Sequence, residues 1–166
     1  DLTATPIGDS AMPPITQLRR LACLDLSGAQ VTDAGMPFLR DIGLLRELRL
    51  ERLRITDDGL AALKPVVTLQ SLDLAETLVT DDGMQHLVPL QSLQHLDLRK
   101  TNVTNDGLAQ IKDLPSIRTL RLAGPFITDD GMAHIKTMQG LVTLDLKDTL
   151  VGTPALAHIK EMAKLR

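Results

Sequence analysis

A Leu-x-Leu triplet recurs at a fixed interval of 24 residues along most of the chain. The copies are Leu24-Asp25-Leu26, Leu48-Arg49-Leu50, Leu72-Asp73-Leu74, Leu96-Asp97-Leu98, Leu120-Arg121-Leu122 and Leu144-Asp145-Leu146. One repeat cannot fold alone, because burying its apolar side chains contributes roughly 10–20 kcal/mol, against an ordering cost of about 1–2 kcal/mol per residue. The repeats must therefore stack into a solenoid in which each unit is stabilised by its neighbours.

The repeat that contains Leu72 and Leu74 shows how each strand is built. Residues two apart in a strand share a face, so these two leucines are predicted to point inward. The side chains predicted to point outward are Ser71, Asp73 and Ala75. Outward positions are free to carry function, because the core does not depend on them.

A second element follows each strand. Met84, Leu87 and Leu90 are spaced by three residues, which predicts a helix or a 3₁₀-like stretch. We expect Thr80 or Asp81 to cap its start, since a short side chain with an oxygen atom accepts a hydrogen bond from the first free amide groups. The following acids would face the positive end of the helix dipole.

The turn before each helix carries a second repeated motif. It reads VTDAGM at 31–36, ITDDGL at 55–60, VTDDGM at 79–84, VTNDGL at 103–108 and ITDDGM at 127–132. With these motifs and this period, the chain resembles leucine-rich-repeat proteins of the (I/V)TDxGL type, which include ribonuclease-inhibitor-like arrays, the repeat domains of F-box proteins and many bacterial repeat proteins. The F-box type often has cysteine five residues after the first strand leucine. The chain instead has Ala29, Leu53, Thr77, Thr101, Pro125 and Thr149 there.

The resemblance implies an α/β fold. We expect a right-handed, curved leucine-rich-repeat solenoid with a parallel β-sheet on its concave face and short helices on its convex face. We expect residues 1–20 to form a degenerate N-terminal half-repeat or cap, because Ile7, Met12 and Ile15 fall in the columns of apolar residues 24 positions later. Residues 21–166 would then form six strand–helix units, which we expect to be part of a longer array.

Composition narrows the classes of function. The net charge of −3 over 166 residues includes no polybasic segment, so we expect no binding to nucleic acid. No stretch has the roughly 20 consecutive apolar residues that a membrane helix needs, so we expect no membrane insertion. Cys23 is the single cysteine, which rules out an internal disulfide and favours a reducing, cytoplasmic compartment while leaving a bacterial envelope or secreted location open.

The outward strand positions form three columns across the sheet and supply the candidate binding site. The predicted binding residues are Glu47, Arg49, Glu51, Asp73, His95, Asp97, Arg99, Arg121, Asp145 and Lys147. The middle column mostly alternates in sign, which is typical of a self-neutralising ladder of cross-strand pairs. Asp73 beside Asp97 is the exception, because two like charges one strand apart repel each other.

Enzymatic chemistry on this face is a weaker hypothesis. Ser71, His95 and either Asp97 or Asp73 project from adjacent strands and could act as nucleophile, base and orienting acid. Catalysis also needs an oxyanion donor and a pocket shielded from water, which an open sheet does not provide. We therefore expect no catalytic residues and no enzymatic activity.

Metal and cofactor sites are also not expected. His86, His134 and His158 share a column on the helical side, but histidines one helix spacing apart, about 10 Å, cannot share an ion. The aspartates of the repeated motif could suggest calcium, yet helix capping accounts for acids at repeated helix starts. We predict no metal ion and no cofactor.

The sequence thus predicts a non-enzymatic scaffold that recognises a protein or peptide through its concave sheet. The alternatives are a regulatory or substrate-receptor segment of a larger protein, as the F-box resemblance implies, and a structural or self-assembling spacer. Weak self-association through the C-terminal edge would belong to the last of these. A further candidate surface is an apolar rim at the strand-to-helix turn, formed by Leu53, Leu78, Phe126 and Leu150.

Overall fold

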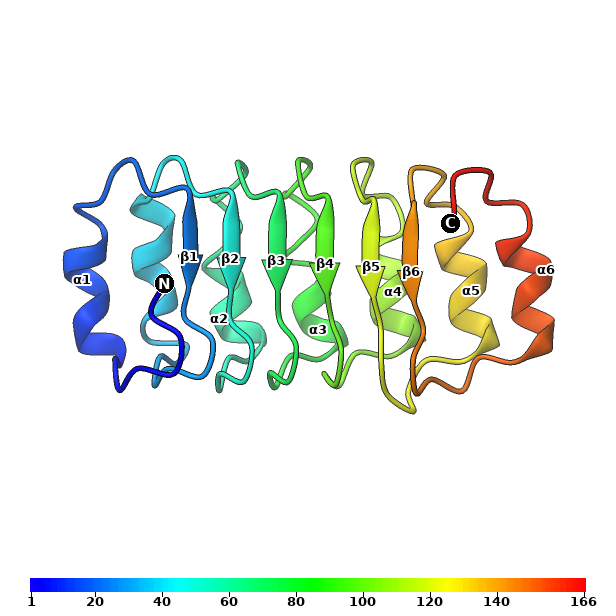
Figure 1. Cartoon of the computed structure of the whole chain (residues 1–166), viewed down its shortest axis with the longest axis horizontal. Helices are drawn as coiled ribbons and strands as arrows, with labels where there is room; N and C mark the ends of the chain where they lie inside the picture. The colour runs from blue at the N-terminus through cyan, green and yellow to red at the C-terminus, as the bar shows by residue number, and fades with distance from the viewer.

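Six parallel strands lie side by side in chain order and form one uncurled sheet, with the helices behind it (Figure 1). The computed structural model describes all of residues 1–166. The strands are β1 (Cys23–Asp25), β2 (Glu47–Arg49), β3 (Ser71–Asp73), β4 (His95–Asp97), β5 (Thr119–Arg121) and β6 (Thr143–Asp145). The α-helices are α1 (Met12–Ile15), α2 (Asp57–Ala61), α3 (Asp81–Met84), α4 (Asn105–Ile111), α5 (Asp129–Ile135) and α6 (Leu156–Ile159). The 3₁₀ helices are η1 (Asp9–Ala11), η2 (Met36–Asp41) and η3 (Thr153–Ala155).

The strand register equals the sequence period, as predicted. Leu48 pairs with Leu24 on one side and with Leu72 on the other, so each residue lies beside its equivalent 24 residues away. One continuous apolar core of 40 buried residues fills the space between the sheet and the helices. None of the helices is long and apolar enough to cross a membrane.

Inward and outward side chains alternate around β3, as predicted. Leu72 and Leu74 are buried and Asp73 is partly exposed, as the period-two pattern requires. Two outward positions are nevertheless buried: Ala75 is only 3% exposed and Asp97 only 5%. The methyl group of Ala75 is short and lies in a column between two longer side chains, Glu51 and Arg99.

The helical side uses short turns instead of long helices. Met84, Leu87 and Leu90 are all fully buried. Helix α3 ends at Met84, and the chain continues through tight turns in which the Leu87 amide donates to Met84 and the Leu90 amide donates to Leu87. The predicted spacing of three therefore reflects 3₁₀-like geometry.

At the start of α3, the threonine and the first aspartate make different hydrogen bonds. Thr80 caps α3 by accepting a hydrogen bond from the Asp82 amide. Asp81 does not cap its own helix but reaches the next repeat, where its carboxylate accepts bonds from the Thr104 amide and hydroxyl, both at 2.7 Å, and from the Gly107 amide at 2.9 Å. Of our two candidate caps, Thr80 was therefore right and Asp81 wrong.

The same aspartate-to-threonine contact links most neighbouring repeats, and we call it the Asp–Thr ladder. Each carboxylate accepts from both the amide and the hydroxyl of the threonine in the next repeat. The other pairs with both bonds are Asp9 with Thr32, Asp33 with Thr56 and Asp57 with Thr80. The repeated acids thus hold adjacent units in register, in addition to facing the helix dipole.

Asn105 interrupts the Asp–Thr ladder. Its Nδ2 donates to the Thr128 hydroxyl at 2.8 Å, and Thr128 makes no capping bond to α5. We expect Asn105→Asp to stabilise the chain by about 1 kcal/mol. The Thr128 hydroxyl could then donate a hydrogen bond to the new carboxylate and accept one from a free backbone amide at the start of α5. Urea denaturation measures this difference. The control Asn102→Asp adds the same charge at a nearby exposed position, and an equal gain from the control would contradict the ladder explanation.

The N-terminal segment follows the geometry of the repeats. The Leu2 amide donates to the Asp25 carbonyl at 2.9 Å, and the Ala4 amide donates to the Ser27 carbonyl at 2.8 Å. Leu26 and Gly28 make the equivalent bonds to Arg49 and Glu51 one repeat later. The division of the chain at residue 20 into a cap and six units remains a proposal.

Candidate functional site

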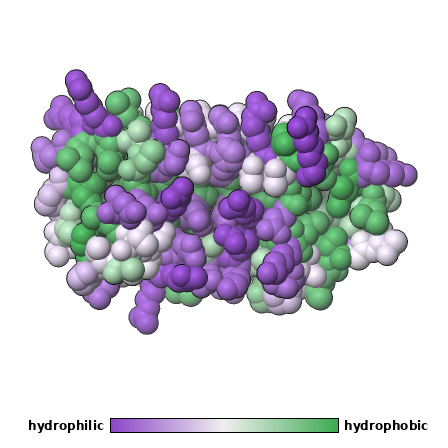
Figure 2. Space-filling model, in the orientation of Figure 1, coloured by the Kyte–Doolittle hydropathy of each residue, from purple (hydrophilic) through white to green (hydrophobic).

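The outward side chains of β1 to β6 cover one broad surface, which we call the sheet face. Hydrophilic side chains gather over its central strands (Figure 2). The parallel register places residues of the same column on adjacent strands, so Arg49, Asp73, Asp97 and Arg121 follow one another across the sheet. The sheet face therefore presents a row of charges held by a regular backbone.

An open cavity of about 350 Å³ lies in the middle of the sheet face. Its lining residues come from β2 to β5 and are Arg49, Ser71, Leu72, Asp73, His95, Leu96, Asp97, Thr119 and Arg121. Half of the predicted binding residues thus line one cavity. The others, which are Glu47, Glu51, Arg99, Asp145 and Lys147, lie on the same face outside this lining.

Asp97 forms ion pairs with two arginines beside the cavity. It is only 5% exposed, and its carboxylate forms ion pairs with Arg99 at 2.7 Å and with Arg121 at 3.5 Å. The Arg99 Nε also donates to both carboxylate oxygens at 2.9 Å. Hydrogen bonding to Asp97 raises the pKa of Arg99. Two cations therefore compensate the buried charge of Asp97.

Asp73 lacks this compensation. Its Oδ1 accepts a hydrogen bond from the Ala75 amide at 2.9 Å, and no ion pair reaches its carboxylate. Burial raises the pKa of Asp73 above its usual 3.8. The like charges of Asp97 and Glu51 raise it further, against the lowering effects of the Ala75 amide and the charge of Arg99. Of the two adjacent acids, only Asp73 keeps a carboxylate oxygen without a partner.

Asp73→Asn is expected to stabilise the folded chain at pH 7 by less than about 1 kcal/mol. Because the folded-state pKa of Asp73 lies above the unfolded value, ionisation costs the folded state free energy at pH values above the folded pKa. This cost disappears below the unfolded value of 3.8, so the gain should vanish at pH 3. Urea denaturation at the two pH values measures the difference.

Asp25→Asn serves as a control of opposite sign. Although burial works against it, hydrogen bonds from Ser27 and Arg49 lower the pKa of Asp25. This variant should therefore be less stable than the wild type at pH 7, and the loss should fade as the pH drops through the folded pKa. A loss of stability at pH 7 for Asp73→Asn would contradict the uncompensated charge.

The aspartates of the middle column also have a structural role that our sequence reasoning missed. Each accepts a hydrogen bond from the amide two residues later, where the chain leaves the strand. The pairs are Asp25 with Ser27, Asp73 with Ala75, Asp97 with Arg99 and Asp145 with Lys147. The recurrence of aspartate at strand ends was the available signal, since such side chains commonly bond to their own backbone.

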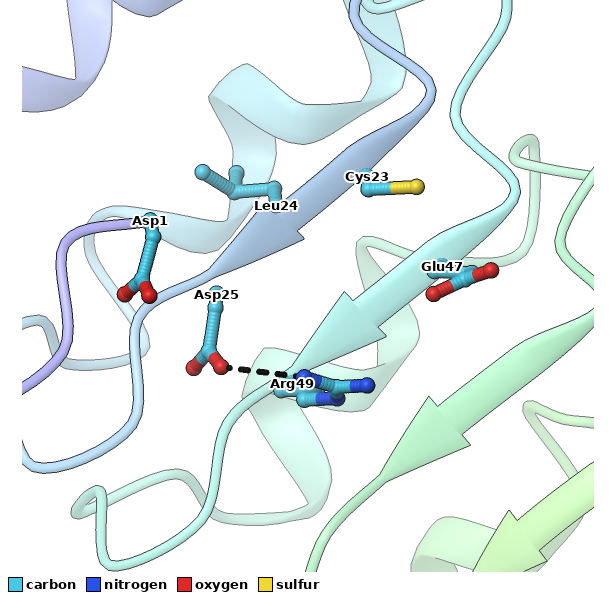
Figure 3. A pocket seen from close by; sticks show the side chains of 6 residues that line it. All are labelled: Asp1, Cys23, Leu24, Asp25, Glu47 and Arg49. Atoms are coloured by element: carbon cyan, nitrogen blue, oxygen red, sulfur yellow. Dashed lines mark hydrogen bonds and ion pairs between the residues drawn. The ribbon is translucent and has the colours of Figure 1, made fainter.

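A smaller cavity of about 150 Å³ lies beside β1 (Figure 3). Its lining residues are Asp1, Cys23, Leu24, Asp25, Glu47 and Arg49. Asp25 and Arg49 point toward each other and form an ion pair at 3.4 Å. Asp25 and Arg49 thus neutralise each other here, whereas Asp73 in the central cavity has no ion pair, so we treat the central cavity as the candidate site.

A row of ion pairs runs along the edge of the sheet where the strands end. Glu76 accepts from Arg52 at 3.1 Å and from Lys100 at 2.7 Å. Hydrogen bonds from Lys100 and Arg52 lower the pKa of Glu76. All three residues have positive φ angles, between 56° and 60°, which the sequence did not predict because none of them is glycine.

The three side chains considered for catalysis are not connected to one another. No hydrogen bond connects Ser71, His95 and Asp97, and the Asp97 carboxylate is already bound by two arginines. No three His, Cys, Asp or Glu side chains lie close enough together to hold a metal ion. On the helical side, burial lowers the pKa of His86, and the positive charge of Lys64 lowers it further. The Nδ1 atom of His86 has no hydrogen-bond partner.

The apolar rim is only partly formed. Leu53 is buried at 2% exposure and belongs to the core. Leu78, Phe126 and Leu150 are each about half exposed or more, with Phe126 and Leu150 in equivalent positions of successive repeats. Asn102 occupies the same column between Leu78 and Phe126, so the exposed apolar side chains are not continuous.

The stacked strand–helix units and the register of 24 residues define a leucine-rich-repeat fold. The sequence agrees with this class, since residues 90–111 match the family model described as Leucine Rich repeat. Comparison with curated proteins finds no significant match.

Solved structures with the same fold include two internalins and a plant receptor. An internalin (inlF) from Listeria monocytogenes is 19% identical with a TM-score of 0.69; the match covers 99% of this chain and 51% of that one, so the chain spans about half its length. Internalin C2 from the same organism is 23% identical with a TM-score of 0.68, over 91% of this chain and 71% of that one. The plant peptide hormone receptor RGFR1, solved in complex with RGF2, is 19% identical with a TM-score of 0.60, over 89% of this chain and 24% of the receptor.

Proposed function

We propose that this chain is a non-enzymatic recognition module that binds a protein or peptide through its sheet face. The observation that carries the proposal is the open central cavity, which is lined by charged side chains from four parallel strands, Asp73 and Asp97 among them. The leucine-rich-repeat class generally serves as a protein-interaction scaffold, and one neighbour with this fold is a peptide hormone receptor.

The composition of the sheet face favours electrostatic recognition. The chain contains no Trp and no Tyr, which are the residues that most often anchor tight interfaces. Affinity must then come from charge complementarity and from groups that the partner supplies. Binding of this kind weakens as salt increases, because exposed charges are screened.

A capture experiment tests the proposal. Proteins retained from a native extract are identified by mass spectrometry, and one is purified and tested for direct binding to two charge-swapped variants. Glu47→Lys with Arg121→Glu exchanges exposed charges on the sheet face without changing net charge. Lys64→Glu with Glu161→Lys does the same at exposed positions after α2 and α6.

We expect the first pair of substitutions to abolish direct binding and the second to leave it intact. Circular dichroism must show that both variants remain folded. Binding that survives the sheet-face exchange, or that is lost with the helical-side exchange alone, would overturn the proposal.

The two alternative functions make different predictions in the same assay. A substrate receptor of the F-box kind would retain components of a larger complex. A self-assembling spacer would retain its own copies, and its sedimentation coefficient would rise with concentration. Self-association through the C-terminal edge is still a prediction; there, Leu144, Leu146 and Val151 are only partly buried.

A further inference from the structure

The charges on the sheet face are divided between its two halves. Over β1 to β3, the outward columns carry four acids and one arginine, a net charge of −3. These residues are Asp25, Glu47, Arg49, Glu51 and Asp73. Over β4 to β6, the columns carry three cations and two acids, a net charge of +1. These residues are Asp97, Arg99, Arg121, Asp145 and Lys147.

Internal pairing leaves one acid available inside the central cavity. Asp25 is paired with Arg49, and Glu51 lies 3.2 Å from Arg52. Asp97 is enclosed by two guanidinium groups. Asp73 alone among the carboxylates that line the cavity has no cation, and its Oδ2 accepts no hydrogen bond.

The surroundings of Asp73 leave room for a long side chain. Along the chain, the outward positions on either side of it are Ser71 and Ala75, which are both small. The cavity above it has a volume of about 350 Å³ and opens to solvent. A metal ion shared by Asp73 and Asp97 does not fit this arrangement, because the oxygens of Asp97 already accept bonds from Arg99 and Arg121.

We propose that the ligand is an extended peptide segment that places a lysine or arginine side chain on Asp73 and an acidic side chain over the basic half of the sheet face. This inference rests on the proposed function and specifies its ligand. The cationic group would bond to the free Oδ2 of Asp73. The acidic group would meet the exposed Arg121 and Lys147.

Sheet geometry fixes the spacing of the two ligand charges. Asp73 and Arg121 lie on strands β3 and β5, and two strand spacings amount to about 10 Å. A peptide in the extended polyproline II conformation advances about 3.1 Å per residue with three residues per turn, so side chains three positions apart point the same way. The basic and acidic residues of the ligand are therefore about three positions apart, in either chain direction.

A selection with a phage-displayed library of random octapeptides tests this inference. The enriched peptides are synthesised and titrated against the wild type, Asp73→Asn and Asp82→Asn by isothermal calorimetry. Asp73→Asn keeps an oxygen for the Ala75 amide and removes only the charge. Asp82→Asn is the control, since it removes the same charge at an exposed position of α3, away from the sheet face, where the side chain makes no hydrogen bond.

We expect enriched peptides to carry Lys or Arg three positions from Asp or Glu. Asp73→Asn should weaken their binding about tenfold while stabilising the free chain, and Asp82→Asn should change the affinity by less than about twofold. A lower affinity together with a higher stability separates a ligand contact from a purely structural role.

The contrary outcomes distinguish the two proposals. Peptides that bind the sheet face but contain no basic residue, or that bind Asp73→Asn as well as the wild type, overturn the ligand inference and leave the proposed function standing. Peptides whose binding survives Glu47→Lys with Arg121→Glu overturn both, and a selection that enriches none overturns the ligand inference.

Discussion

Replacement of Asp81 by alanine is expected to lower the free energy of unfolding by about 3 kcal/mol. The carboxylate accepts three hydrogen bonds from the next repeat, two from Thr104 and one from the Gly107 amide. Alanine leaves these donors without their acceptor at a partly buried interface between repeats. Stability in a solenoid is a sum of nearest-neighbour interfaces, so a loss at the central interface weakens the whole array.

Asp82→Ala is the matched control. Asp82 is the next residue, it is exposed, and its side chain makes no hydrogen bond. It shares with Asp81 only the favourable position at the positive end of α3, an effect of roughly 0.3–1 kcal/mol. Urea denaturation followed by circular dichroism compares the two variants. Equal losses would mean that Asp81 acts through the helix dipole and not through the Asp–Thr ladder.

Gly107→Ala is expected to destabilise the chain by about 2–3 kcal/mol, although alanine is the better helix former by about 1 kcal/mol. An ideal Cβ at this position would lie 2.4 Å from Asp81 Oδ1 and 2.7 Å from Val103 Cγ1. The carboxylate cannot move aside without losing its bonds to Thr104. Close packing between repeats therefore reverses the sign that helix propensity predicts.

Gly43→Ala and a double variant complete this test. A Cβ on Gly43 meets no atom within 4 Å, so this substitution should change stability little. In the double variant of Asp81→Ala with Gly107→Ala, the added methyl group occupies space that the carboxylate has vacated. The combined loss should then be smaller than the sum of the single losses. A strictly additive result would show that the two residues do not interact.

The pairing of Asp73 with Asp97 could be predicted, because a constant register brings equivalent positions of neighbouring repeats together. Which cations pair with each carboxylate could not be predicted. Arg99, two residues after the end of β4, folds back onto Asp97, and Arg121 approaches from the next strand. Long side chains choose among several acids within reach, and this choice depends on burial and on three-dimensional distances that the period does not contain.

The role of the repeated aspartates was underestimated for a related reason. Sequence reasoning treated the Asp–Asp–Gly triplet as a helix start, which is a local explanation. In the structure, Asp57 and Asp81 accept hydrogen bonds from residues 23 positions later. The glycine of the next repeat has no side chain that would collide with this carboxylate. Local propensity describes a single unit, whereas these contacts exist only after two units have stacked.

The sequence by itself determined the fold: the interval of 24 residues sets the strand register, and the alternation of leucines decides which side of each strand is buried. Those features repeat, and a periodic pattern has few ways to bury its apolar residues. Only the tertiary structure decided which carboxylate is compensated, which one stays free in the central cavity, and how the ladder holds the repeats in register. Electrostatic pairing depends on distance and desolvation, and both are set by the packing of many residues together.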